Sequence, residues 1–218
     1  MTNTDKISEL INYQGYRRSN ECKLDGRYFD IVCNKYAGVM KYPIEIHIKS
    51  KSVMIRVREI VYDYSILTVA RVTIFDSNIR HSSVLFVDSS KKTLELWDPI
   101  EPGMTDNYVE QIKNALKYQL VPEGFTFQYT PAYFIPEFSN KCSVGRRGYC
   151  NAYVLREALN RIINKTFDTT GDIRSFITAV EENYSDKLTG NPDIEYGFGS
   201  FLAGAVVGGV LVNKSKQK

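Results

Sequence analysis

The middle of the chain is rich in β-forming sequence, and this constrains the fold more than any other feature. Three segments between residues 44 and 75 carry β-branched residues in alternation or in apolar runs: IEIHIK, SVMIRVREIVY and ILTVARVTIF. HSSVLFVDSSKKTLELWDP then has the apolar arms and polar centre of a β-hairpin. Helical spacing of apolar residues follows over 107–120 and again over 172–184. Another strand is expected over 125–135, where Pro131 predicts a bend or an edge position. Strands in the middle with helices on either side predict an α+β domain with a central antiparallel sheet.

A further helix is expected in RRGYCNAYVLREALNRI, residues 146–162, and it begins with a cysteine. Apolar side chains form one stripe of this helix, at Val154, Leu155, Ala158, Leu159 and Ile162. Cys150 lies one turn ahead of Val154 and therefore faces the buried side from the first turn. The positive end of a helix dipole favours a thiolate there. Taken alone, however, such a cysteine is more often a small buried hydrophobic residue.

Composition limits the kinds of site that the chain can carry. Its 218 residues, 43% of them hydrophobic, suit one globular domain, and a net charge of +3 with interspersed signs predicts no nucleic-acid surface. Cysteine occurs four times, at Cys22, Cys33, Cys142 and Cys150. Without a recognisable signal peptide, these predict free thiols in a reducing compartment. No C-x-x-C pair and no Gly-rich phosphate loop is present, and the histidines are His47 and His81 only, so neither a metal nor a cofactor is expected.

His81 lies at the open end of the predicted hairpin. If the turn is centred between Ser89 and Ser90, a symmetric antiparallel register pairs His81 with Asp98. Directly opposed residues have Cβ atoms roughly 4.5–5.5 Å apart, within reach of a hydrogen bond between carboxylate and imidazole. Taken alone, this pair is more simply a surface contact that closes the hairpin. His47, within an alternating strand, is expected to be an ordinary strand-face residue.

The cysteine helix and the histidine hairpin, taken together, favour a catalytic site over a buried cysteine and a surface His–Asp contact. A cysteine at a helix start and a His–Asp hairpin in one chain are much less common together than either is alone. They predict a catalytic triad in which Cys150 attacks, His81 takes the proton of the thiol, and Asp98 orients His81.

The order and spacing of these residues resemble a known family. Asp98 follows His81 by 17 residues, and Cys150 follows after 52 more, in the pieces HSSVLFVD, LELWDPIEPG and RRGYCNAYVL. This arrangement resembles the ubiquitin-like-protein-specific cysteine proteases, the group of the SUMO proteases and the adenovirus protease, and is most similar to divergent versions encoded by large DNA viruses. The resemblance spans residues 69–164. It implies a papain-like fold and cleavage of peptide or isopeptide bonds in a ubiquitin-like protein or a viral polyprotein.

The chain departs from the family pattern at several positions. The family's oxyanion glutamine, some residues before the cysteine, has no counterpart in KCSVGRR. Candidates to replace it are Asn140, Cys142, Ser143 and the backbone N–H of Cys150. Asn151 stands where a glycine often follows the nucleophile, and Ser82 stands where an aromatic residue often follows the histidine. Two alternative functions therefore stay open: a catalytically degenerate, membrane-tethered interaction module, and an acetyltransferase on the same fold.

The C-terminal part contains an apolar run, FGSFLAGAVVGGVLV, followed by NKSKQK. As a helix, its 15 residues would span about 22 Å, less than the roughly 30 Å of a bilayer core. Gly204 and Gly208 belong to a small-xxx-small face that favours close helix packing and self-association. A membrane-associated segment over 197–213 is expected, which would anchor a cytoplasmic domain in a host cell or virion. The alternative is burial against the domain. The remaining chain is divided into an N-terminal extension, 1–42, and the protease-like domain, 43–190.

Overall fold

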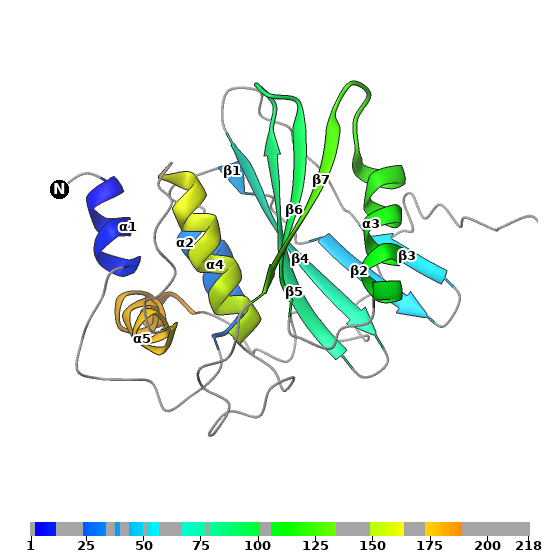
Figure 1. The fold of residues 1–218 in the computed structure, drawn as a ribbon. Helices are drawn as coiled ribbons and strands as arrows, with labels where there is room; N and C mark the ends of the chain where they lie inside the picture. Colours follow the sequence, from blue (N-terminus) through cyan, green and yellow to red (C-terminus); the bar gives the residue numbers. More distant parts are fainter. Residues whose placement is uncertain are drawn as a thin grey trace, which may run out of the picture.

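The computed structural model describes residues 3–11, 24–33, 38–39, 44–49, 52–56, 67–76, 79–100, 106–133, 149–163 and 173–188 (Figure 1). The helices are α1 (Asn3–Ile11), α2 (Arg27–Cys33), α3 (Asp106–Leu120), α4 (Tyr149–Ile162) and α5 (Ile173–Tyr184), with a 3₁₀ turn over Ser185–Lys187. The strands are β1 (Gly38–Val39), β2 (Ile44–Lys49), β3 (Ser52–Arg56), β4 (Thr68–Asp76), β5 (Ile79–Asp88), β6 (Thr93–Ile100) and β7 (Thr126–Tyr133). The predicted α+β class is confirmed, and the expected helices over 107–120, 146–162 and 172–184 correspond to α3, α4 and α5.

The described strands form one seven-stranded sheet in the order β3-β2-β4-β5-β6-β7, with β1 beside β4. The pairs β2–β3, β4–β5 and β5–β6 are antiparallel, whereas β1–β4, β2–β4 and β6–β7 are parallel. The expectation of an antiparallel sheet is therefore correct only for part of it. The parallel β6–β7 pair arises because α3 carries the chain back along the sheet before β7 begins. Pro131 lies in β7, at the end of the strand order, which confirms the edge position.

The turn of the β5–β6 hairpin lies one residue further along the chain than the sequence predicted. Its last ladder pair joins Asp88 to Thr93, so residues 89–92 form the turn. The Asp88 carboxylate accepts hydrogen bonds from the backbone N–H groups of Ser90 (3.1 Å) and Lys91 (3.0 Å). An aspartate that bonds the backbone two and three residues ahead stabilises a turn that starts from its own position. The centre of the hairpin thus moves one residue towards the C-terminus.

Apolar side chains cover both faces of the sheet. On one face, the strands and the helices α1, α2, α4 and α5 share a cluster of buried side chains, here called the helix-side cluster. On the other face, the strands and α3 share a second one, the α3-side cluster (Figure 1). Along β5, Val84 and Phe86 belong to the helix-side cluster, and Leu85 and Val87 to the α3-side cluster. This alternation is the period of two expected for a strand buried on both faces. The sheet is thus a central layer, and α4, which carries Cys150, packs directly on β5.

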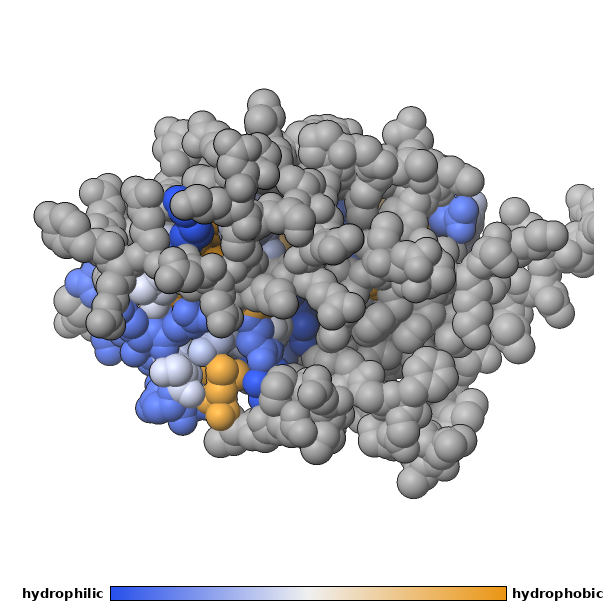
Figure 2. All heavy atoms as spheres, turned by 90° about the horizontal axis from the view of Figure 1, so that it is seen from below, coloured by the Kyte–Doolittle hydropathy of each residue, from blue (hydrophilic) through white to orange (hydrophobic). Residues whose placement is uncertain are grey.

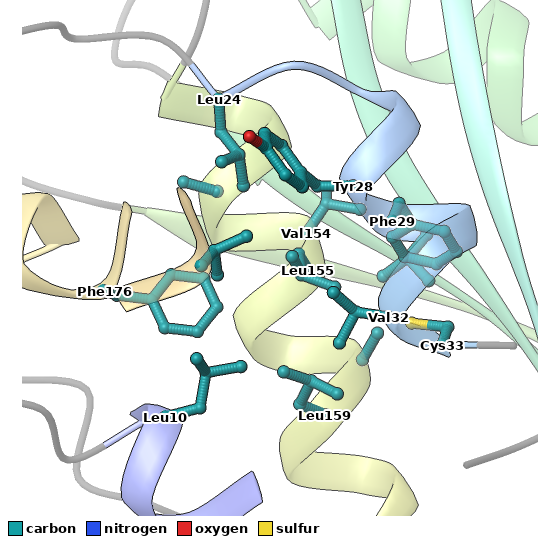
Figure 3. Packing of buried hydrophobic residues seen from close by; sticks show 14 of the residues in the cluster. Leu10, Leu24, Tyr28, Phe29, Val32, Cys33, Val154, Leu155, Leu159 and Phe176 are labelled. Atoms are coloured by element: carbon teal, nitrogen blue, oxygen red, sulfur yellow. The ribbon is translucent and has the colours of Figure 1, made fainter. Parts of the chain in front are cut away.

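The N-terminal part contributes more to the core than the sequence indicated. Both α1 and α2 lie within the range 1–42, and α2 was not predicted from the sequence. Figure 3 shows Leu10 of α1 and Phe29 and Val32 of α2 packed against α4 and α5, near Leu155 of α4 and Phe176 of α5. The seven residues of α2 give too few turns for a clear helical period, although five of them are buried. The range predicted as an extension therefore includes two helices of the helix-side cluster.

The described surface is polar. Where described residues are visible in Figure 2, hydrophilic side chains predominate, and Tyr118 (81% exposed) is the only large hydrophobic side chain exposed on the described part. No helix within that part is long and apolar enough to cross a membrane. The predicted membrane segment, 197–213, lies outside the described residues, so its membrane contact and self-association through Gly204 and Gly208 stay predictions.

Candidate active site

The structure brings His81 and Asp98 together, but by a different register from the one predicted. The β5–β6 ladder, continued by one residue, places Ser83 opposite Asp98, so the direct pairing of residues 81 and 98 is wrong by two positions. A shift of two keeps the side chains on the same face of the sheet. His81 therefore reaches Asp98 diagonally, and its Nε2–H donates to Oδ1 at 2.5 Å. The predicted contact is still formed, because a register error of two positions equals the side-chain period of a strand.

Asp98 is buried and receives three hydrogen bonds. Its exposed fraction is 1%. Oδ1 accepts from His81 and from the Ser83 hydroxyl at 2.6 Å, and Oδ2 accepts from the Tyr129 hydroxyl at 3.1 Å. Burial alone would raise the pKa of Asp98, but the positive charge of His81 and the three hydrogen bonds outweigh it, so that the pKa is lowered. Asp98 is therefore an ionised carboxylate at neutral pH.

Cys150 completes the group from the other side of His81. It is the second residue of α4 and is partly exposed. Its side chain is hydrogen-bonded to that of His81, and the backbone N–H groups of Ser82 and Asn151 donate to its sulfur. Burial alone would raise the pKa of the thiol, but His81 and these N–H groups outweigh it and lower the pKa. Because Nε2 of His81 is engaged by Asp98, Nδ1 is the ring nitrogen left for the thiol.

The pKa of His81 moves in the opposite direction. His81 is 7% exposed, and burial alone would lower its pKa. Asp98 and Cys150 outweigh this and raise the pKa from 6.5 to about 10. A histidine with a raised pKa beside a cysteine with a lowered pKa favours an imidazolium–thiolate pair at neutral pH. This is the protonation state that a thiol nucleophile requires.

Cys33 provides a contrast within the same molecule. It lies in α2 with an exposed fraction of 0%. Burial, with a further contribution from the negative charge of Asp30, raises the pKa of this thiol well above its usual value. A protonated, inaccessible thiol is unreactive. Cys22 and Cys142 lie outside the described residues.

Two polar contacts fix α4, one at each end. In the first turn, the Asn151 side-chain amide donates to the backbone carbonyl of Leu24 at 2.9 Å. In the last turn, the Arg161 guanidinium binds both carboxylate oxygens of Glu95 on β6, at 3.1 and 3.2 Å. Paired bonds of this kind have a strict planar geometry. They help to hold the helix that carries Cys150 against the strand that carries Asp98.

The segment before α2 lies close to Arg71 of β4, and a glycine occupies the point of closest approach. A Cβ atom on Gly26 would lie 2.2 Å from Nη1 of Arg71, on β4, and 3.6 Å from Nδ2 of Asn151. Arg71 in turn forms an ion pair with Asp30 of α2 at 3.7 Å. Only a residue without a side chain allows this approach without a shift of Arg71.

Several expectations about the site fall outside the described residues. Three of the oxyanion candidates, Asn140, Cys142 and Ser143, lie there, as does the side chain of His47. Within the described ranges, no group of three or more potential metal ligands is present. Sequence reasoning missed Ser83 and Tyr129. Ser83 could have been found, since it lies two residues from His81 on one strand, whereas Tyr129 depends on the parallel pairing of β6 with β7.

No family model matches this sequence, and no curated protein matches it either. Among solved structures, the chain is similar to the C-terminal Ulp1 protease domain in complex with Smt3, the yeast ortholog of SUMO (18% identity, TM-score 0.37, 56% of this chain and 54% of that chain). It is also similar to Ulp1 with its catalytic cysteine oxidised to a sulfenic acid (17%, 0.35, 56% and 54%). A third similar structure is the Legionella pneumophila effector RavZ, residues 1–487 (11%, 0.38, 83% and 63%). The chain spans about half the length of the Ulp1 chains it matches.

Proposed function

We propose that this protein is a cysteine peptidase that acts through Cys150, His81 and Asp98. The observation that carries the proposal is the continuous hydrogen-bonded chain from the thiol of Cys150, a partly exposed residue, to the imidazole and the buried carboxylate. The pKa directions of the cysteine and histidine support it. A domain used only for binding would not need a thiol whose pKa is lowered against the effect of burial.

The reaction proceeds in two stages. The Cys150 thiolate attacks the carbonyl carbon of the scissile bond, and the His81 imidazolium protonates the leaving amine as the C–N bond breaks. The product is a thioester on Cys150. Neutral His81 then accepts a proton from water, whose oxygen attacks the thioester, and the thiolate leaves as the carboxylic acid product forms. Asp98 holds the imidazole in the correct tautomer and stabilises its charged form at each stage.

The substrate class follows from the sequence resemblance around the three residues. It suggests the C-terminal tail of a ubiquitin-like protein, linked through a peptide or isopeptide bond. A viral structural polyprotein is the alternative within the same chemistry, and both offer an extended peptide to the thiol.

An active-site probe tests the proposal. A ubiquitin-like protein that ends in an electrophile after glycine, and a short glycine-ended peptide with the same electrophile, are incubated with the full chain, and the adduct is mapped by mass spectrometry. We expect an adduct on Cys150 that is abolished in Cys150→Ala and in His81→Ala. Cys33 in the same sample is the internal control. An adduct on another cysteine, or equal labelling of His81→Ala, would refute the mechanism.

A further inference from the structure

Asp98 is held by residues from two strands besides its own. Ser83 lies on β5 and donates to Oδ1, while Tyr129 lies on β7 and donates to Oδ2. The His81 bond shares Oδ1 with Ser83. Both oxygens of the carboxylate are thus engaged, and the plane of the group is fixed from two directions. Because Asp98 is only 1% exposed, water cannot easily replace a donor that is lost.

We propose that Ser83 and Tyr129 are positioning residues that keep the Asp98 carboxylate ionised and turned towards His81, and that they thereby set the lower pH limit for reactivity of Cys150. This inference rests on the proposed function. Neither residue belongs to the predicted triad, and neither touches the reacting thiol in the contacts described above. They act through Asp98 and His81.

Within the described part of the chain, few ionisable groups act on Asp98. Among the described residues, the ionisable groups that act on it are His81 from β5 and Tyr129 from β7, and Cys150 of α4 is connected through His81. From the remaining element on this face, α3, the side chains in the cluster are Ile112, Leu116 and Leu120, which are apolar. A carboxylate that accepts several hydrogen bonds in a site closed to water stays ionised to lower pH than one that accepts fewer.

Loss of one of these hydroxyls changes the pKa values of Asp98, His81 and Cys150 in turn. Removal of the Tyr129 hydroxyl raises the pKa of Asp98, because the anion loses a donor. Once Asp98 takes up a proton or turns away from His81, the imidazolium loses its negatively charged partner, and the pKa of His81 falls. The thiolate then loses part of its partner's charge, so the pKa of Cys150 rises. A lost hydrogen bond to a charged group corresponds to about one to two pH units at Asp98. We expect about half a unit to one unit at Cys150, two contacts away.

The test measures the pH dependence of alkylation of Cys150 by iodoacetamide, with peptide mapping to separate it from the other cysteines. The variants are Tyr129→Phe and Ser83→Ala, each of which removes little more than a hydroxyl. Tyr118→Phe, which removes the hydroxyl of an exposed tyrosine, is the matched control. The midpoint for Cys150 should move to higher pH in both variants and stay unchanged in the control.

The same measurement in an Asp98→Asn background separates a positioning role from a general effect on structure. If Tyr129 and Ser83 act through the carboxylate, their substitutions shift the midpoint little once the carboxylate is gone. The inference would be overturned if the Cys150 midpoint shifts equally in both backgrounds or does not shift. A shift of the midpoint to lower pH would also overturn it, because it would mean that the two hydroxyls compete with His81 for the Asp98 carboxylate. A wild-type protein whose Cys150 titrates like an ordinary cysteine would instead refute the proposed function itself, and the inference with it.

Discussion

Replacement of Asp98 by asparagine should slow the reaction of Cys150 with a glycine-ended electrophile by roughly 30- to 150-fold. The two side chains have nearly the same shape, but asparagine carries no charge. Burial lowers the pKa of His81, whereas Asp98 and Cys150 raise it more, from 6.5 to about 10. That net rise corresponds to about 5 kcal/mol in favour of the imidazolium. Asp98 contributes both the opposite charge and a hydrogen bond, and the loss of a hydrogen bond to a charged group costs about 2–3 kcal/mol.

The assay is the second-order rate of adduct formation at Cys150, followed by intact-protein mass spectrometry. Asp88→Asn is the matched control, because Asp88 lies in the same hairpin but at the opposite end of β5. It should react at the wild-type rate, while His81→Ala should lose several orders of magnitude, since His81 transfers the proton and Asp98 only orients it. A thermal melt of each variant monitors folding. Asp98→Asn at the wild-type rate would show that Asp98 does not support His81, and a loss as large as that of His81→Ala would contradict the division of roles.

Four further outcomes are expected. In the native protein near neutral pH, iodoacetamide should label Cys150 at least about 100-fold faster than Cys33, which should react only on unfolding; comparable rates would refute the contrast between the two sites. Gly26→Ala should destabilise the fold by about 1–3 kcal/mol in denaturant titrations, because its Cβ would overlap the guanidinium beneath it; unchanged stability would show that this region relaxes freely. Asp88→Ala should lower the melting temperature at pH 7. Hydrogen bonds from the hairpin turn outweigh the effect of slight burial and hold the pKa of Asp88 at about 2 in the folded state, so the difference in melting temperature should fade as the pH drops from 3.8 towards about 2. A difference that persists at pH 2 would contradict this. Deletion of residues 197–218 should release the protein from membranes without a change in Cys150 labelling, and a large drop in melting temperature of an already soluble protein would show the tail to be part of the core.

The local sequence determined the elements of the site. The apolar stripe of 146–162 predicts α4, and it places Cys150 on the first turn before any tertiary contact is known. The hairpin brings His81 near Asp98 for a similar reason, since both lie on strands joined by a short turn. Even a misplaced turn left the two on one face, because an error of two positions matches the strand period. Periods of 3.6 and 2 are properties of neighbouring residues, so the sequence alone reveals them.

Tertiary structure decided what depends on segments far apart in the chain. The parallel pairing of β6 with β7 brings Tyr129 to Asp98 across 31 residues, and no local pattern indicates it. The short helix α2 is stabilised by burial against α4 and α5 rather than by its own period, which is why it was missed. The same holds for the two thiols. Cys33 and Cys150 both lie in helices, but burial raises the pKa of one, while contact with His81 lowers that of the other. Burial and the charge of a distant partner arise only when the chain folds, so the sequence could name the nucleophile as a candidate but could not supply the surroundings that activate it.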